Sequence, residues 1–91
     1  MALPYRQPSD DELIERYILP EPFAPDRAKL AGAGVSVWVL VDYLRFTGGD
    51  VAATAAEYEV STEAVAAAQA YYERHRDAID ARITLHRAAF V

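Results

Sequence analysis

Hydrophobic residues between positions 35 and 72 recur with the spacing of short amphipathic helices, and turn signals interrupt this stretch twice. The segment Gly48-Gly49-Asp50 ends the first helix and caps the second, and Ser61 or Thr62 caps the third. A short helix, a tight turn and a longer helix are typical of a helix-turn-helix unit, whose last helix is usually offered to a partner. The pattern predicts helices over residues 37–46 and 50–58, and a third from residue 62 onward.

The third helix carries a long hydrophobic stripe. No stop signal follows Thr62 until near the end of the chain, so we expect one helix that runs past Ile83. A helix of about 25 residues is some 37 Å long, which exceeds a three-helix core. Either the N-terminal arm or a second copy packed as in a coiled coil should cover the stripe, and a helix bent around its own domain is the remaining alternative. The stripe repeats every seven residues, at Val65, Tyr72, Ile79 and His86. The predicted homodimer interface consists of Val65, Tyr72, Ile79 and Ile83.

All five prolines lie before residue 26, which separates an arm over residues 1–34 from a helical body over residues 35–91. Within the arm, the sequence Ser-Asp-Asp-Glu at 9–12 has the form of a capping box and predicts a helix over about residues 10–19. Its hydrophobic positions share one face, so we expect it to dock: Leu13, Ile14, Tyr17 and Ile18. Glycines 32 and 34 mark a turn, and either flanking segment is a candidate short strand of a small β-hairpin. The expected fold is otherwise all-α.

Charge and composition restrict the function. The net charge of −5 opposes nonspecific attraction to nucleic acid or anionic lipid. The chain has no cysteine, which excludes disulfides and thiolate metal sites. No segment approaches the roughly 18 apolar residues of a membrane span, and residues 1–4 lack the form of a signal peptide. We therefore expect a cytoplasmic protein that does not contact membrane. A domain of this size buries only about 60% of its unfolded surface, so association with a second copy or a partner is expected.

No catalytic or metal site is predicted. His75 and His86 lie on one predicted helix, and neither has a second histidine at metal-ligand spacing. The serines at 9, 36 and 61 are each explained as helix caps, which leaves no nucleophile beside a base. The glycines at 32 and 34 lack the pattern of a phosphate-binding loop. We expect a protein that is not an enzyme and holds no cofactor.

Several segments of the body resemble the small bacterial family catalogued as domain of unknown function 433. The similarity spans about residues 34–83, and its most specific part is the ending AYYERHRDAID at 70–80. The other segments are GVSVWVLVDYL at 34–44, DV at 50–51, AAEY at 55–58 and TEAV at 62–65. Where the family pattern begins Gly-Thr-Arg-Ile-Pro, this chain has Gly-Val-Ser at 34–36, without the arginine and the proline.

This resemblance implies a homeodomain-like helix-turn-helix fold and the role of a VapB-type antitoxin. Such a protein dimerises, binds a PIN-like ribonuclease toxin and represses its own operon by binding operator DNA. From their positions in this chain, the candidate DNA contacts are Thr62, Glu63 and Ala66 on the outward face at the start of the third helix, and the candidate phosphate contacts in a dimer are Arg45, Arg74 and Arg76.

The residues themselves give little support for reading of DNA bases. With Val65, Ala68, Gln69 and Tyr72 turned inward, the outward face of the third helix opens with small or acidic residues. These are Thr62, Glu63, Ala66, Ala67 and Ala70. Base edges are read by Arg, Lys, Asn or Gln, so sequence-specific binding by an isolated copy is not expected. The safer interpretation of the three arginines is surface ion pairing with Asp42, Asp77 and Asp80.

A toxin-binding surface is predicted near the C-terminus. PIN-like nucleases hold metal with clustered carboxylates, which a guanidinium matches in bidentate fashion. The candidate residues are Arg82, Ile83, Arg87 and Phe90, and the simpler alternative is a solvated, frayed helix end. Two functions stay open: an antitoxin-like regulator, and a homo-oligomeric protein-interaction module that does not bind DNA.

Overall fold

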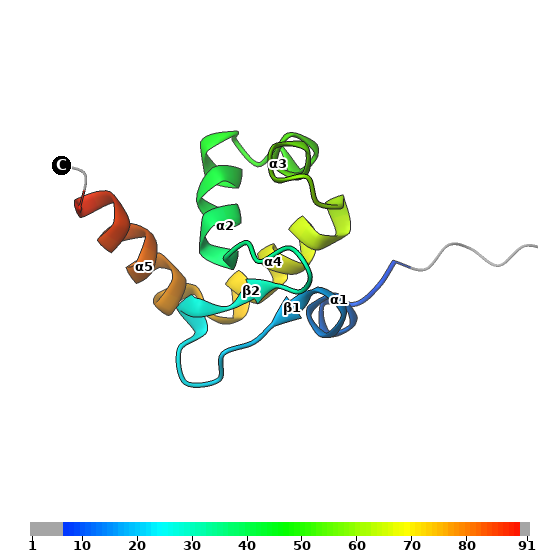
Figure 1. Cartoon of the computed structure of the whole chain (residues 1–91), viewed down its shortest axis with the longest axis horizontal. Helices are drawn as coiled ribbons and strands as arrows, with labels where there is room; N and C mark the ends of the chain where they lie inside the picture. Colours follow the sequence, from blue (N-terminus) through cyan, green and yellow to red (C-terminus); the bar gives the residue numbers. More distant parts are fainter. Residues whose placement is uncertain (1–6, 90–91) are drawn as a thin grey trace, which may run out of the picture.

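The computed structural model describes residues 7–89, so residues 1–4, where no signal peptide is expected, lie outside it. In chain order the elements are α1 (Asp10–Tyr17), β1 (Ile18–Leu19), the 3-10 helix η1 (Pro25–Arg27), β2 (Lys29–Leu30), α2 (Val37–Phe46), α3 (Val51–Tyr58), α4 (Thr62–Arg74) and α5 (Arg76–Ala88) (Figure 1). The mainly helical fold with a small sheet confirms the expected class, and the helix-turn-helix assignment of α3 and α4 stays a prediction. Within the described range, no helix combines the length and the apolar character that crossing a membrane requires.

The helix limits of the body follow local signals. The Asp50 carboxylate accepts a hydrogen bond from the Ala53 N–H at 2.9 Å, and Ser61 Oγ accepts one from the Ala64 N–H at 3.0 Å. Gly48 and Gly49 adopt positive φ angles of 73° and 93°, which a side chain would disfavour. The caps at Asp50 and Ser61 and the turn between the first two body helices are therefore confirmed. The cap expected from the Ser36 side chain is wrong, since within residues 7–89 this side chain makes no capping hydrogen bond.

The arm forms a different sheet from the expected hairpin. Strand β2 pairs antiparallel with β1, in the register Ile18 with Leu30 and Leu19 with Lys29. Lys29 also bridges Ser36 across the glycine turn, so the hairpin is present as a single bridge. Helix α1 ends at Tyr17, before the expected limit, because the next two residues are extended and pair with β2. Pro20 fits this extended path, since a residue before proline avoids helical geometry.

One hydrophobic core joins the arm to the body. Helix α4 packs against α1, α2 and α3, and α2 lies between α3 and α5 (Figure 1). The arm contributes Leu13, Ile18, Ala28 and Leu30 to the same cluster as the body residues Leu40 and Tyr71. Alanine at many α4 positions leaves room for close helix approach. The predicted docking of the first helix is confirmed.

The expected continuous C-terminal helix is wrong. His75 has φ −135° and ψ 37°, which ends α4 at Arg74 and starts α5 at Arg76. The physical reason is burial: Ile79 and Ile83 are 0% and 2% exposed, and α5 reaches α2 and η1 only by leaving the axis of α4. The local sequence, which contains no helix stop signal, favours one helix here, and tertiary packing overrides that preference.

The hydrophobic stripe is consequently covered by its own chain. Val65, Ile79 and Ile83 lie in the core of a single copy, and Tyr72 is half-buried. Three of the four residues predicted for the dimer interface are therefore not accessible in this conformation. The arm and the body cover the stripe together. Two of the alternatives raised by the sequence are thus combined: cover by the arm, and a C-terminal segment bent around its own domain. Homodimer formation itself stays a prediction.

We expect Ser61→Ala to lower the free energy of unfolding by about 1 kcal/mol, because the Ala64 N–H loses its acceptor. Ser36→Ala is the matched control. Ser36 also precedes a helix, but within residues 7–89 its side chain makes no capping hydrogen bond, so its loss should stay below about 0.5 kcal/mol. Urea unfolding of both variants measures the difference, and equal losses would contradict the assignment of the cap.

Candidate functional site: a polar network beside an aromatic groove

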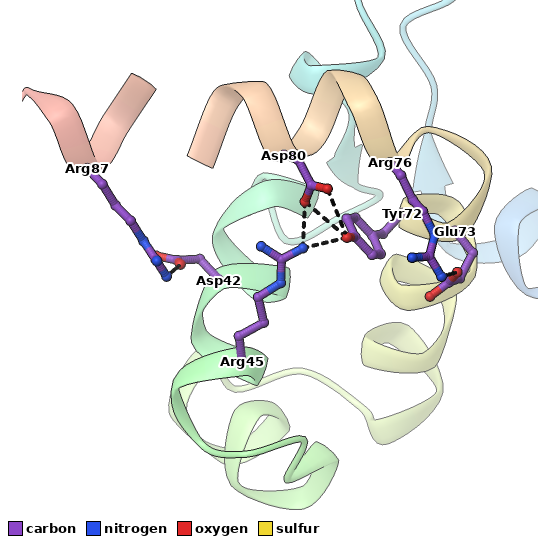
Figure 2. A network of polar contacts seen from close by, with 7 residues as sticks. All are labelled: Asp42, Arg45, Tyr72, Glu73, Arg76, Asp80 and Arg87. Carbon is purple, nitrogen blue, oxygen red and sulfur yellow. Dashed lines mark hydrogen bonds and ion pairs between the residues drawn. The ribbon is translucent and has the colours of Figure 1, made fainter. Parts of the chain in front are cut away.

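Three helices meet at one guanidinium group. Arg45 of α2 donates through Nη2 to Asp80 Oδ1 of α5 and to the Tyr72 hydroxyl of α4, both at 2.5 Å (Figure 2). The Tyr72 hydroxyl lies 3.0 and 3.2 Å from the two Asp80 carboxylate oxygens. The Arg45 guanidinium carbon also lies 5.0 Å from the centre of the Tyr72 ring. We call Arg45, Tyr72 and Asp80 the polar network.

The break at His75 is what brings this network together. In a continuous helix, residues 72 and 80 would be separated by about 12 Å along the axis. With α5 turned away from α4, the Tyr72 hydroxyl instead contacts the Asp80 carboxylate directly. Sequence spacing alone places these two residues on the same long helix and gives no signal of their contact.

Electrostatics favour the charged forms of both ionisable partners. The hydrogen bond from Arg45 holds the pKa of the Asp80 carboxyl below its ordinary value, and the Tyr72 hydroxyl and the Arg76 charge act in the same direction. The hydrogen bond to Asp80 likewise raises the pKa of Arg45. Both side chains remain more than a third exposed, so solvent screens the pair and its contribution to stability is modest.

Further ion pairs attach α5 on either side of the network. Arg87 of α5 contacts Asp42 of α2 at 2.6 Å, as Figure 2 shows. Arg82 lies 3.6 Å from Asp26 of η1. Its guanidinium carbon is also 5.6 Å from the centre of the Trp38 ring. Helix α5 is therefore held by charges that come from α2 and from the arm.

The predicted ion-pair partners are wrong in detail. Arg45 pairs with Asp80 and Asp42 pairs with Arg87, because α5 lies along α2 and offers an opposite charge to each. Arg76 pairs with Glu73 one turn before it, across the break (Figure 2). The three arginines proposed for phosphate contact all form ion pairs, as the alternative interpretation predicted. Only Arg45 pairs with one of the expected partners, which were Asp42, Asp77 and Asp80.

Helix α1 covers the face of α4 that was expected to point outward. The Tyr17 hydroxyl donates to Glu63 Oε2 at 2.7 Å, and Arg16 lies 3.7 Å from the same oxygen. Farther along α4, Arg74 pairs with Asp11 at 2.5 Å. The predicted inward and outward residues are partly exchanged, since alanines 67 and 70 are buried and residue 69 is exposed. The predicted inward and outward residues are partly exchanged because α1 docks on the small alanine side chains of α4, which leave space for it.

The residues predicted to contact DNA therefore do not form one surface. Glu63 and Arg74 bind α1, and Ala66 packs against the core. Thr62 is exposed at the start of α4. Arg45 belongs to the polar network.

An aromatic groove of about 490 Å³ lies where α2, α3 and α5 meet. The Tyr43 ring meets the Tyr58 ring edge-on, with centres 5.5 Å apart, and lies 5.9 Å from the Phe46 ring. Phe46 is 83% exposed. Burial raises the pKa of Tyr58. The groove is lined by Trp38, Val39, Asp42, Tyr43, Phe46, Tyr58, His86 and Arg87. Clustered aromatic side chains with an arginine are typical of protein-binding surfaces.

The predicted toxin-binding residues do not lie together in one surface. Arg87 lines the aromatic groove, Ile83 is buried in the core, and Arg82 pairs with the arm. Phe90 lies outside the described residues. The groove was not predicted from the sequence. The spacing of Tyr43 and Phe46, one helical turn apart, is the signal that indicates a shared aromatic face.

Neither the family models nor the curated proteins nor the solved structures contain a significant match to this chain.

We expect Asp80→Asn to lower the free energy of unfolding at pH 7 by up to about 1 kcal/mol, because Arg45 loses a charged acceptor. The pKa of Asp80 is lowered on folding, so the stabilisation is complete above the ordinary aspartate pKa of about 3.9 and is lost as the pH falls through the lower folded pKa. The gap between the two proteins should therefore shrink from pH 7 to pH 3.

Urea unfolding at both pH values measures this gap. Glu15→Gln, which removes an exposed carboxylate on α1, is the control and should change stability by less than about 0.5 kcal/mol at pH 7. A gap that stayed constant with pH would show that Asp80 acts through packing and not through its charge.

Proposed function

We propose that this chain is an antitoxin-like module that binds a partner protein in the aromatic groove. The observation that carries the proposal is the groove itself, a half-buried aromatic cluster with the exposed Phe46 and with Arg87 in its lining. The resemblance to the domain of unknown function 433 family supplies the class of partner, a PIN-like ribonuclease. Cytoplasmic location and a homodimeric form belong to the same proposal.

The groove has both components of a binding surface. Phe46 protrudes beside Tyr43 and Tyr58, so a partner that covers this cluster removes a large aromatic area from water. Arg87 is 62% exposed and contacts the Asp42 carboxylate, which is largely covered. A partner with clustered carboxylates, such as a metal-binding nuclease site, offers this guanidinium a second acceptor in bidentate geometry.

Direct recognition of operator DNA through α4 is not included in the proposal. Glu63 at the start of α4 is negatively charged and is held by Tyr17 and Arg16 of α1. Helix α1 would have to leave before this face of α4 could enter a major groove. The net charge of −5 acts against phosphate binding as well. Protein contact therefore accounts for the exposed surface better than DNA contact does.

We expect Phe46→Ala to weaken binding to the partner by about 10-fold or more, because Phe46 is the most exposed aromatic side chain of the groove. The partner tested is the protein encoded by the adjacent gene, measured by isothermal titration calorimetry against the full chain. Arg87→Ala should weaken the same binding. Phe23→Ala is the matched control, since Phe23 is fully exposed in the arm and does not line the groove, and it should change the affinity less than about 2-fold.

Equal affinities for the Phe46→Ala variant and the unmodified chain would refute the groove as the binding surface. A parallel salt titration with DNA from upstream of the gene tests the operator-binding alternative. Phosphate contacts produce a steep loss of affinity with salt, so tight, strongly salt-dependent binding by the chain alone would favour a DNA-binding regulator over the function proposed here.

A further inference from the structure

We infer that α5 exchanges between two copies of this chain. In the exchanged dimer, His75 becomes helical, residues 62–88 form one continuous helix, and α5 of each copy docks on α2 and η1 of the other. This inference does not depend on the partner proposed for the aromatic groove.

The first argument is the nature of the break. The sequence from residue 61 to residue 88 contains neither glycine nor proline, so no residue in it opposes a continuous helix. Only His75 departs from helical geometry between α4 and α5, with φ −135° and ψ 37°. A single rotation about that residue therefore joins the two helices. Short, constrained hinges of this kind favour exchange of the element that follows them.

The break also leaves hydrogen bonds unmade. The His75 N–H donates to the Tyr72 carbonyl at 3.0 Å, a tight turn in place of the regular helical bond to residue 71. Within residues 7–89, the His75 side chain makes no capping bond to the amides at the start of α5. Closing the break supplies helical acceptors to these amides. The continuous helix thus gains local hydrogen bonds that the kinked chain lacks.

The second argument is the origin of the contacts that hold α5. Its ion pairs to Arg45, Asp42 and Asp26 all reach residues far earlier in the chain. Ile79 and Ile83 are buried where α5 packs on α2 and η1. An identical copy presents the same α2 and η1, so these contacts can form between chains without any change in their chemistry. Exchange therefore keeps the tertiary contacts of α5 and adds the local ones.

The third argument is the heptad stripe. Val65, Tyr72 and Ile79 recur every seven residues, which places them along one face only when α4 and α5 form a single helix. In the single copy the break interrupts this pattern after Tyr72. In the exchanged dimer Ile79 stays buried against α2 and η1, now those of the other copy, and the restored stripe runs from the core of one copy to the core of the other. The continuous helix of the exchanged form therefore fits the sequence pattern.

The helical propensity of residue 75 sets the balance between the two forms. Alanine favours the continuous helix and glycine favours the break, by about 1 kcal/mol per hinge, which for two hinges corresponds to about a 30-fold difference in the dimer dissociation constant. We expect His75→Ala to dimerise about 30-fold more tightly than His75→Gly. Light scattering after size-exclusion chromatography measures both, following equilibration at millimolar concentration.

A chemical cross-link identifies the exchanged contact. The chain has no cysteine, so Asp42→Cys combined with Arg87→Cys places one thiol on α2 and one on α5 at the position of their ion pair. A short bismaleimide added to the dimer fraction of this variant should give a covalent dimer on a denaturing gel. In an unexchanged chain the same reagent links the two thiols within one copy, and the band stays monomeric. Each single-cysteine variant serves as the control for random collisions.

Two results would overturn the inference. The first is a dimer fraction whose cross-links are all within single chains, since that dimer would use another surface. The second is a pair of His75 variants that are folded by circular dichroism and have the same monomer–dimer equilibrium. Neither readout measures binding of a partner protein, so failure here and failure of the proposed function are distinguishable.

Discussion

The docking of α5 on α2 is the contact on which the rest of the structure depends. Full burial of Ile79 and Ile83 stabilises the fold by about 1.5–3 kcal/mol for each side chain, whereas an exposed pair such as Arg45 with Asp80 contributes about 0–1 kcal/mol. Hydrophobic burial therefore fixes α5 in place, and the polar network selects its orientation. The break at His75 is the backbone consequence, because within a single copy both isoleucines reach the core only when α5 leaves the axis of α4.

The docking of the arm on α4 likewise determines which surface of the molecule a partner can reach. Helix α1 packs on the alanine-rich face of α4 and binds Glu63 through Tyr17. Because alanine is small, the same face accommodates a helix of the arm at close range. This docking removes the surface that a helix-turn-helix protein would use for DNA. The groove then lies where α2, α3 and α5 meet, and Phe46 is its protruding aromatic side chain.

The groove and the docking of α5 are connected through one ion pair. Asp42 and Arg87 line the groove and also attach α5 to α2. A ligand carboxylate that binds Arg87 competes with Asp42, so occupation of the groove weakens one of the contacts that hold α5. Through this shared contact, ligand binding in the groove and docking of α5 on α2 are thermodynamically linked. The coupling free energy is limited to that of a surface ion pair.

Signals within a few residues determined the limits of the body helices. The Gly48-Gly49 turn, the Asp50 and Ser61 caps and the span of α2 were all predictable, because each depends on local backbone geometry and hydrogen bonding. The break at His75 was not, since no residue near it disfavours a helix and the burial that causes it lies on α2 and η1. The partner of Asp42 was mistaken for the same reason: we expected one of Arg45, Arg74 and Arg76, but α5 places Arg87 at close range. The sequence by itself thus determined the limits of α2 and α3 and the start of α4. Only the tertiary structure decided the break at His75 and the faces that the helices cover, because an alanine-rich face accepts either burial or exposure until a neighbour is placed against it.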